Sequence, residues 1–125
     1  MYLTNLLDEL IVLHNDARIN KWLWKANPLV KNEELMSYAQ SWANKMAVSE
    51  SLRHSSMSDI MKLGFRSAAE NIAYGQSTPE QVMKTWMNSS GHKRNILNGS
   101  LTDIGCGMSL SPSGRPYWCV CFGKK

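Results

Sequence analysis

The C-terminal stretch constrains the fold of this chain more than any other feature. The segment YWCVCF, residues 117–122, carries no charge and is apolar at every position. Such a strand is typical of a sheet centre, because it needs cover on both of its faces. The preceding segment DIGCGMSL, residues 103–110, places apolar side chains at alternate positions instead. Because SPSG between the two is a turn signal, we expect an antiparallel hairpin within a covered sheet.

Two amphipathic helices are expected in the first half of the chain. Apolar residues recur at three- and four-residue steps over residues 3–17, which is one face of a helix. Pro28 then interrupts the helical pattern. Asn32 is a suitable cap for a second helix, whose first turn holds Glu33 and Glu34, where the helix dipole favours carboxylates. We therefore expect one helix on each side of the interruption.

The sequence STPEQVMKTW gives the clearest helix start. Thr78 is the N-cap, Pro79 fits the first helical position, and Gln81 completes a capping box three residues after the threonine. We assign Thr78 a structural role on this ground. The helix is expected to end near Ser89 or Ser90, so that His92 follows in a polar loop.

Two shorter elements lie between these helices. Residues 58–63 fit one short helix ended by Gly64, and residues 70–75 alternate as a strand does. With helices available for both faces of the sheet, the predicted fold class is α/β (α+β): a three-layer α–β–α sandwich with a small central antiparallel sheet. A chain of 125 residues fits a single domain, residues 1–125, with one core.

The charge and hydropathy patterns narrow the choice of partners. The net charge is +4, and the basic residues are scattered along the chain. Nucleic-acid binders usually concentrate positive charge on one stripe, so we expect no nucleic-acid partner, while contact with an anionic membrane surface stays open. No apolar run approaches the roughly 20 residues of a transmembrane segment. No signal peptide is visible, so an intracellular protein and a processed secreted chain both fit.

Three cysteines stand at positions 106, 119 and 121. One C-x-C pair with a distant third cysteine does not have the spacing of a zinc knuckle. If the hairpin turn is centred between residues 112 and 113, Cys106 lies opposite Cys119, and a disulfide could form with small adjustments that the flanking glycines allow. The alternative is two small core residues packed face to face with free thiols.

Four polar residues lie at the ends of predicted elements: His54, Glu70, Gln81 and His92. Each alone has an ordinary structural explanation, such as a solvated charge, a helix cap or a loop histidine. As a group they are better evidence for a functional site, because clefts and functional loops gather at the ends of helices and strands. Two imidazoles and a carboxylate are also sufficient for a zinc site with an open position. The fold would have to bring His54 and His92 together across 38 residues.

Several segments follow one another in an informative order: LHNDAR (13–18), LRHSS (52–56), AENIAYG (69–75), PEQVMKTWMNSSGHKRNIL (79–97), DIGCGM (103–108) and YWCVCFG (117–123). This order and spacing resemble the CAP superfamily, which includes cysteine-rich secretory proteins, wasp-venom antigens of the antigen-five type, plant pathogenesis-related proteins and bacterial relatives. The compact bacterial SCP domains are the most similar. The resemblance extends from about residue 10 to residue 123.

The resemblance implies a sandwich with a central groove that holds two histidines and two acidic residues. By motif position, the histidines are His54 and His92, which would bind a metal, and the first acid is Glu70. The second acid would stand five residues before Trp86, where this chain has Gln81. Glutamine supplies no negative charge, so a Zn2+ ion would lose one neighbouring carboxylate, and a general-base role would rest on Glu70 alone.

The resemblance leaves three functions open. The first is a groove protein that binds zinc and a small apolar ligand, such as a lipid or sterol, or a peptide, without established catalysis. The second is a zinc-dependent, peptidase-like hydrolase with Glu70 as base. The third is a protein-interaction module whose groove is vestigial. We favour the first and lean away from an enzyme, because Gln81 replaces an acid and no activated nucleophile is visible.

Three further expectations accompany these functions. The family resemblance implies an extracellular, secreted and monomeric protein. Asn15 and Arg18, in the HNxxR stretch, would brace the first helix and are assigned structural roles. Tyr2, Trp22 and Trp24 could form an exposed aromatic patch for lipid, although the core is the commoner place for such side chains.

Overall fold

The computed structural model describes residues 2–19 and 26–125, with side chains placed from residue 5 onward. The expected aromatic patch of Tyr2, Trp22 and Trp24 lies outside the described side chains. The described helices are α1 (Tyr2–Ile19), α2 (Glu33–Ser49), α3 (Met57–Met61), α4 (Pro79–Met87) and α5 (Ser90–Leu97). The described strands are β1 (Val30–Lys31), β2 (Ser67–Tyr74), β3 (Asp103–Leu110) and β4 (Pro116–Lys124).

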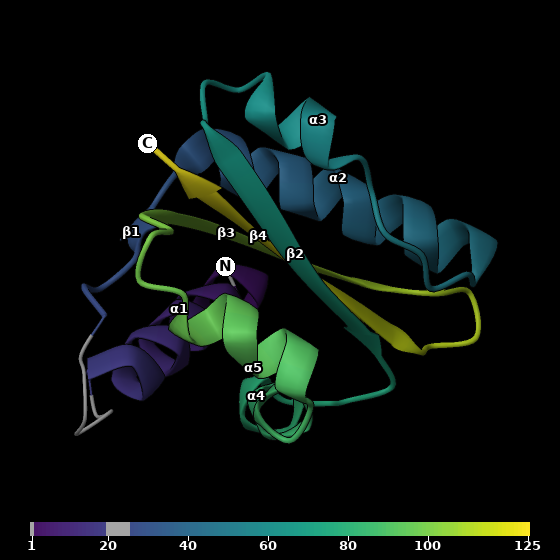
Figure 1. Ribbon diagram of the computed structural model, residues 1–125. Helices are drawn as coiled ribbons and strands as arrows, with labels where there is room; N and C mark the ends of the chain where they lie inside the picture. The colour runs from purple at the N-terminus through teal and green to yellow at the C-terminus, as the bar shows by residue number, and fades with distance from the viewer. Residues whose placement is uncertain (1, 20–25) are drawn as a thin grey trace.

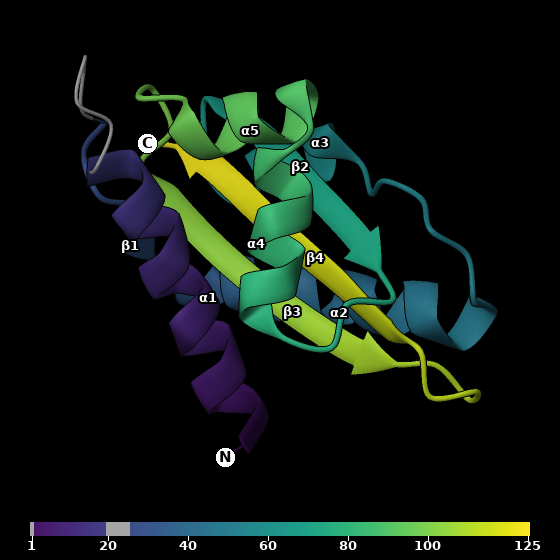
Figure 2. The same cartoon turned by 90° about the horizontal axis from the view of Figure 1, so that it is seen from below.

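The strands form a sheet in the order β1-β3-β4-β2, with β4 antiparallel to both of its neighbours. Helices α2 and α3 cover one face, and α1, α4 and α5 cover the other (Figures 1 and 2). The three-layer α–β–α sandwich is therefore confirmed. The two-residue strand β1, which the sequence did not predict, pairs in parallel with β3, so the sheet is not purely antiparallel.

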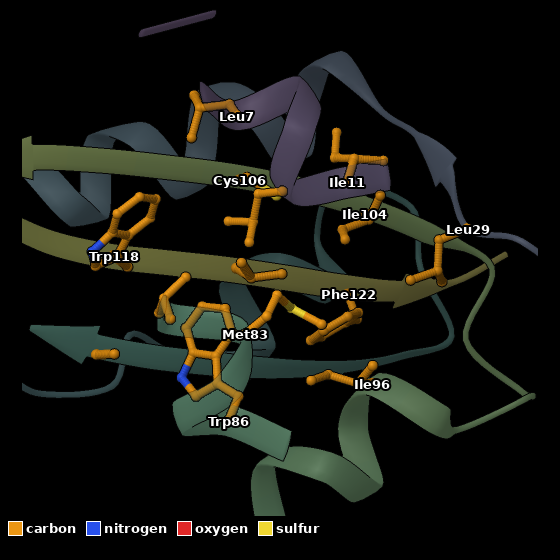
Figure 3. Packing of buried hydrophobic residues seen from close by; sticks show 14 of the residues in the cluster. Leu7, Ile11, Leu29, Met83, Trp86, Ile96, Ile104, Cys106, Trp118 and Phe122 are labelled. Atoms are coloured by element: carbon orange, nitrogen blue, oxygen red, sulfur yellow. The ribbon is translucent and has the colours of Figure 1, made fainter. Parts of the chain in front are cut away.

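Strand β4 lies inside the sheet, and residues 117–123 are all buried, as the unbroken apolar pattern predicted. Trp118, Val120 and Phe122 pack against the layer of α1, α4 and α5. Figure 3 shows Trp118 and Phe122 in this cluster together with Trp86 from α4. Tyr117, Cys119 and Cys121 point to the opposite face and join the core under α2.

The register of the hairpin differs from the prediction by one residue. Cys106 pairs with Val120, and Gly107 pairs with Cys119. The reason is a five-residue connection, residues 111–115, closed by a hydrogen bond of 2.8 Å from Ser111 N to the carbonyl of residue 115. A one-residue shift sends a side chain to the other face of the sheet. The possible Cys106–Cys119 disulfide is therefore not formed, the two residues do not pack face to face either, and all three cysteines are buried free thiols.

The glycines beside Cys106 serve close packing instead. A Cβ atom built on Gly105 would overlap backbone atoms of Leu35 and Met36, and one on Gly107 would overlap the backbone of Gln40. Helix α2 therefore lies directly on the backbone of β3. Strand β1 pairs only with residues 103 and 104 of β3. Farther along the same edge of β3, the side chain of Gln40 bonds both the carbonyl and the N–H of Met108, at 2.8 and 3.2 Å. This contact occupies part of an otherwise unpaired sheet edge.

The helix starts follow local capping chemistry. Asn32 accepts a hydrogen bond of 3.0 Å from Leu35 N at the start of α2, and Thr78 accepts one of 3.2 Å from Gln81 N at the start of α4. The expected polar loop after Ser90 is absent from the described fold. Instead α4 ends at Met87, α5 begins at Ser90, and His92 lies in the first turn of α5.

Candidate functional site

Glu70 and His54 meet at the edge strand β2. Glu70 lies on the face of β2 that α2 and α3 cover, with Cys121 as its register partner on β4. His54 follows α2 in the segment that leads to α3. Its Nδ1 atom lies 2.8 Å from Oε1 of Glu70. A carboxylate only accepts hydrogen bonds, so Nδ1 carries the proton and donates it.

The carboxylate of Glu70 is occupied by donors on both oxygens. Besides His54, Oε1 accepts the backbone N–H of Ser55 at 2.9 Å. Oε2 accepts the Ser55 hydroxyl and faces the thiols of Cys119 and Cys121, at 3.6 and 3.8 Å. The Glu70 side chain is fully buried. Because no oxygen of Glu70 is free to take a proton from a substrate, the geometry favours a role in positioning His54, and the general-base role stays a prediction.

His92 approaches β2 from the other layer. Its Nδ1 atom shares a hydrogen bond of 2.9 Å with the hydroxyl of Ser89. The side chain of Asn71, next to Glu70 on β2, donates to the carbonyl of His92 at 3.1 Å, and Asn95 donates to Asn71 at 2.9 Å. Consecutive residues of β2 thus hold elements of both layers, since Glu70 fixes His54 and Asn71 fixes the start of α5.

The pKa of His92 is lowered by its surroundings. Desolvation lowers the pKa of His92, and the charge of His54 lowers it further. A lowered pKa favours the neutral imidazole, which is the form that binds metals. Within residues 2–19 and 26–125, neither Nε2 atom has a hydrogen-bond partner. More than half of the His54 side chain is exposed, so its Nε2 can meet an ion from solvent.

Gln81 does not join these residues. Its side-chain oxygen accepts a hydrogen bond of 2.8 Å from the backbone N–H of Ser77. Its backbone N–H donates to the hydroxyl of Thr78, which caps the helix. The residue is exposed, and in the described part of the chain it makes no hydrogen bond to His54, Glu70 or His92. The structure thus joins His54 to Glu70, holds His92 at the neighbouring Asn71, and leaves Gln81 at the start of α4.

Asn15 and Arg18 lie elsewhere and bond to the backbone. Asn15 pairs with both backbone groups of Leu29, at 3.1 and 2.7 Å. The buried guanidinium of Arg18 donates to four carbonyls: those of Asn27, Ile96, Asn98 and Leu101. These bonds tie α1 to the segment before β1 and to the connection from α5 to β3. They support the fold rather than the histidine pair.

Sequence reasoning missed several residues that contact Glu70, Asn71 or His92: Ser55, Asn71, Ser89, Asn95, Cys119 and Cys121. Two signals were available. An asparagine inside the apolar run ENIA is a buried polar group that needs partners. In a strand, C-x-C places both thiols on one face, and with the correct register that face also carries Glu70.

No described helix of this chain combines the length and the apolar character that crossing a membrane requires.

Comparisons with known proteins agree with this architecture. The chain is 42% identical over 94 residues to the uncharacterized protein YkwD of Bacillus subtilis strain 168, a match that covers 69% of this chain and 37% of that protein. The chain thus spans well under half the length of this curated relative.

Solved structures are similar over nearly the whole chain. An extracellular protein containing a SCP domain from Bacillus anthracis has a TM-score of 0.84 at 23% identity, covering 98% of this chain and 41% of that one. NaASP2, in a crystal structure with Zn2+, has a TM-score of 0.66 at 14% identity, covering 96% and 77%. At these identities the likeness shows the fold alone. The model of the cysteine-rich secretory protein family matches residues 12–122, and the chain therefore belongs to this family, the CAP family.

Proposed function

We propose that this chain, as a single CAP domain over residues 1–125, binds a divalent metal ion, Zn2+ first, through Nε2 of His54 and Nε2 of His92. One observation carries the proposal. Each imidazole has its Nδ1 atom held by the chain, by Glu70 or by Ser89, whereas neither Nε2 atom has a hydrogen-bond partner in the described residues. Both rings are thereby oriented with the same nitrogen available for a ligand.

The donor set suits zinc. Histidines that bind a metal usually donate their other ring N–H to a carboxylate or similar acceptor, which fixes the ring and raises its basicity. Glu70 does this for His54 at 2.8 Å. Two imidazoles leave further coordination positions for water or a ligand atom. Bound zinc would act as a Lewis acid toward such a ligand. NaASP2, which shares the fold, is described with Zn2+, and this supports the choice of the first metal to test.

We favour binding over catalysis. A hydrolase would need a base with a free oxygen, but both oxygens of Glu70 accept hydrogen bonds from His54 and Ser55, and the side chain is fully buried. The ion would then anchor a polar group of a small ligand or peptide rather than activate water for attack. We further propose a secreted, monomeric protein, in line with the extracellular description of the Bacillus anthracis relative.

Zinc titration by isothermal calorimetry tests the proposal. We expect wild type to bind Zn2+ and His92→Ala to lose more affinity than the roughly 10–100-fold that loss of an outer-shell partner costs. Lys93→Ala is a matched control, because it changes an exposed neighbour on the same helix. Absence of heat in wild type, or equal affinity in wild type and His92→Ala, would refute binding at the histidine pair.

A further inference from the structure

A second group of ligand atoms lies beneath Glu70 and takes no part in the histidine site. Cys119 and Cys121 alternate along β4 and place their thiols on the α2 face of the sheet. Their Sγ atoms are 3.7 Å apart. Oε2 of Glu70 lies 3.6 Å from the first thiol and 3.8 Å from the second. The three residues thus form a compact, buried triangle of sulfur and oxygen atoms.

The triangle has the dimensions that a tetrahedral metal ion requires. Zinc binds thiolate sulfur at about 2.3 Å and carboxylate oxygen at about 2.0–2.2 Å. At tetrahedral angles, these bond lengths separate two sulfurs by about 3.8 Å and a sulfur from an oxygen by about 3.6 Å. The observed separations of 3.7, 3.6 and 3.8 Å match these values without movement of any backbone.

We infer that Cys119, Cys121 and Oε2 of Glu70 form a buried binding site for a thiophilic divalent cation of the Zn2+ or Cd2+ class. On binding, each thiol S–H bond gives way to a sulfur–metal bond, and two protons leave to solvent. Thiolate ligands select against Mg2+ and Ca2+, which prefer oxygen alone. The site is separate from the histidine pair, since it uses Oε2, whereas Oε1 holds His54.

The burial of Glu70 strengthens this inference. In residues 2–19 and 26–125, the salt bridge that Glu70 makes is to His54, and no lysine or arginine pairs with it. A buried carboxylate without a strong cation is costly. A divalent ion held by two thiolates and this carboxylate leaves the group with a single net negative charge, but it gives Oε2 a direct cationic partner. His54 and Ser55 cover the carboxylate from the solvent side, so an ion would reach the thiols after His54 parts from Oε1 and the Ser55 hydroxyl from Oε2.

Cys106 offers a control inside the same sheet. It is equally buried, but it lies on the opposite face, among the apolar residues of the α1 layer. It therefore tests whether a buried thiol alone suffices. Its replacement should leave the inferred site intact, whereas replacement of either Cys119 or Cys121 should abolish it.

Cobalt and cadmium titrations of the reduced full chain provide the test. Thiolate-bound Co2+ shows a sulfur-to-metal charge-transfer absorption, which an ion held by histidines does not show. We expect this absorption in wild type, in Cys106→Ser and in His92→Ala, and its loss in Cys119→Ser and Cys121→Ser. Failure of the histidine proposal would leave the sulfur signal untouched, so the two proposals stand or fall separately.

Two outcomes would overturn the inference: no charge-transfer absorption in wild type, or absorption that persists in the Cys119→Ser, Cys121→Ser double variant. Circular dichroism shows whether each variant folds. If the serine variants do not fold, cadmium NMR of the wild-type chain decides without mutation, because the chemical shift of bound 113Cd distinguishes sulfur ligands from nitrogen and oxygen ligands. Absence of any shift of the sulfur type would also overturn the inference, whether or not the histidine pair gives a shift of the nitrogen type.

Discussion

The two faces of β4 carry side chains of different size and chemistry. Toward α1, α4 and α5 it presents Trp118, Val120 and Phe122, which fill the space between sheet and helices with bulk. Toward α2 it presents the small residues Cys119 and Cys121. On that side the helix backbone lies directly on β3, and a carboxylate is buried. One face is built for packing volume, and the other for close approach and for positioned polar atoms.

The difference teaches that an apolar pattern conceals function when the ligand atom is sulfur. Cysteine behaves as a small hydrophobe in a core, so YWCVCF indicates a covered strand whichever face its thiols occupy. Only the register shows that the thiols share a face with Glu70. We expect close packing on the α2 face, exclusion of water from the face covered by α1, α4 and α5, and a weaker dependence on the polar atoms at the edge of β2.

The largest effect is expected where α2 lies on β3. Gly107→Val should destabilise the fold by about 3 kcal/mol or more, because the added atoms would overlap the backbone of Gln40, which cannot rotate away. Urea denaturation measures the change.

Gly91→Ala is the control, since no atom of the described residues lies within 4 Å of its Cβ position in α5. Alanine there should leave stability unchanged or raise it by about 0.5–1 kcal/mol. Equal costs at the two positions would show that α2 does not press on β3 as the structure places it.

The opposite face should be sensitive to acid through His14. This residue is fully buried between Trp86 and Phe122, and desolvation lowers its pKa from 6.5 to about 4. Because the unfolded chain takes up the proton first, the stabilising effect of neutral His14 is complete above pH 6.5 and declines as the pH falls toward 4. The loss should reach about 3 kcal/mol.

Two measurements check this prediction. Urea denaturation at several pH values gives the free energy of unfolding, and NMR titration gives the pKa of His14 directly. His92 serves as an internal comparison, because it is only half-buried. A His14 that titrates near 6.5 would mean that water reaches this side of the core.

A smaller effect is expected at the edge of β2. Glu70→Gln keeps the size of the side chain but weakens its acceptor to His54, so zinc affinity at the histidine pair should fall roughly 10–100-fold. Calorimetry measures the affinity, and Glu34→Gln, an exposed change on α2, is the matched control. Unchanged affinity in Glu70→Gln would show that His54 needs no carboxylate to hold its orientation.

Much of the fold could be predicted because its signals are local. Asn32 and Thr78 cap helices through bonds to residues three positions away, and periodicity places the strands. The hairpin register could not be predicted, because SPSG does not reveal that the connection takes five residues. The error was small along the chain, but it moved Cys106 to the wrong face relative to Cys119.

The site was harder to predict than the fold, because its contacts join distant segments. The motif resemblance selected His54, Glu70 and His92, but it could not show that both oxygens of Glu70 accept hydrogen bonds from His54 and Ser55. His92 was expected in a loop, because two serines and a glycine resemble a helix end. The helix restarts at once, since the N–H of Lys93 bonds to the carbonyl of Ser89 at 2.8 Å.

The smallest effect is expected at Gln81, where motif position and structure disagree. If residue 81 faced the ion, Gln81→Glu would add a carboxylate and tighten zinc binding. In the structure the side chain instead bonds the N–H of Ser77 at 2.8 Å, a contact that glutamate would keep at a helix start, where negative charge is favoured. We therefore expect unchanged zinc affinity in calorimetry and a gain in stability of a few tenths of a kcal/mol, within the usual 0.3–1 kcal/mol for such charges. Tighter zinc binding would contradict this placement, because it would mean that residue 81 lies beside the histidines as a third ligand.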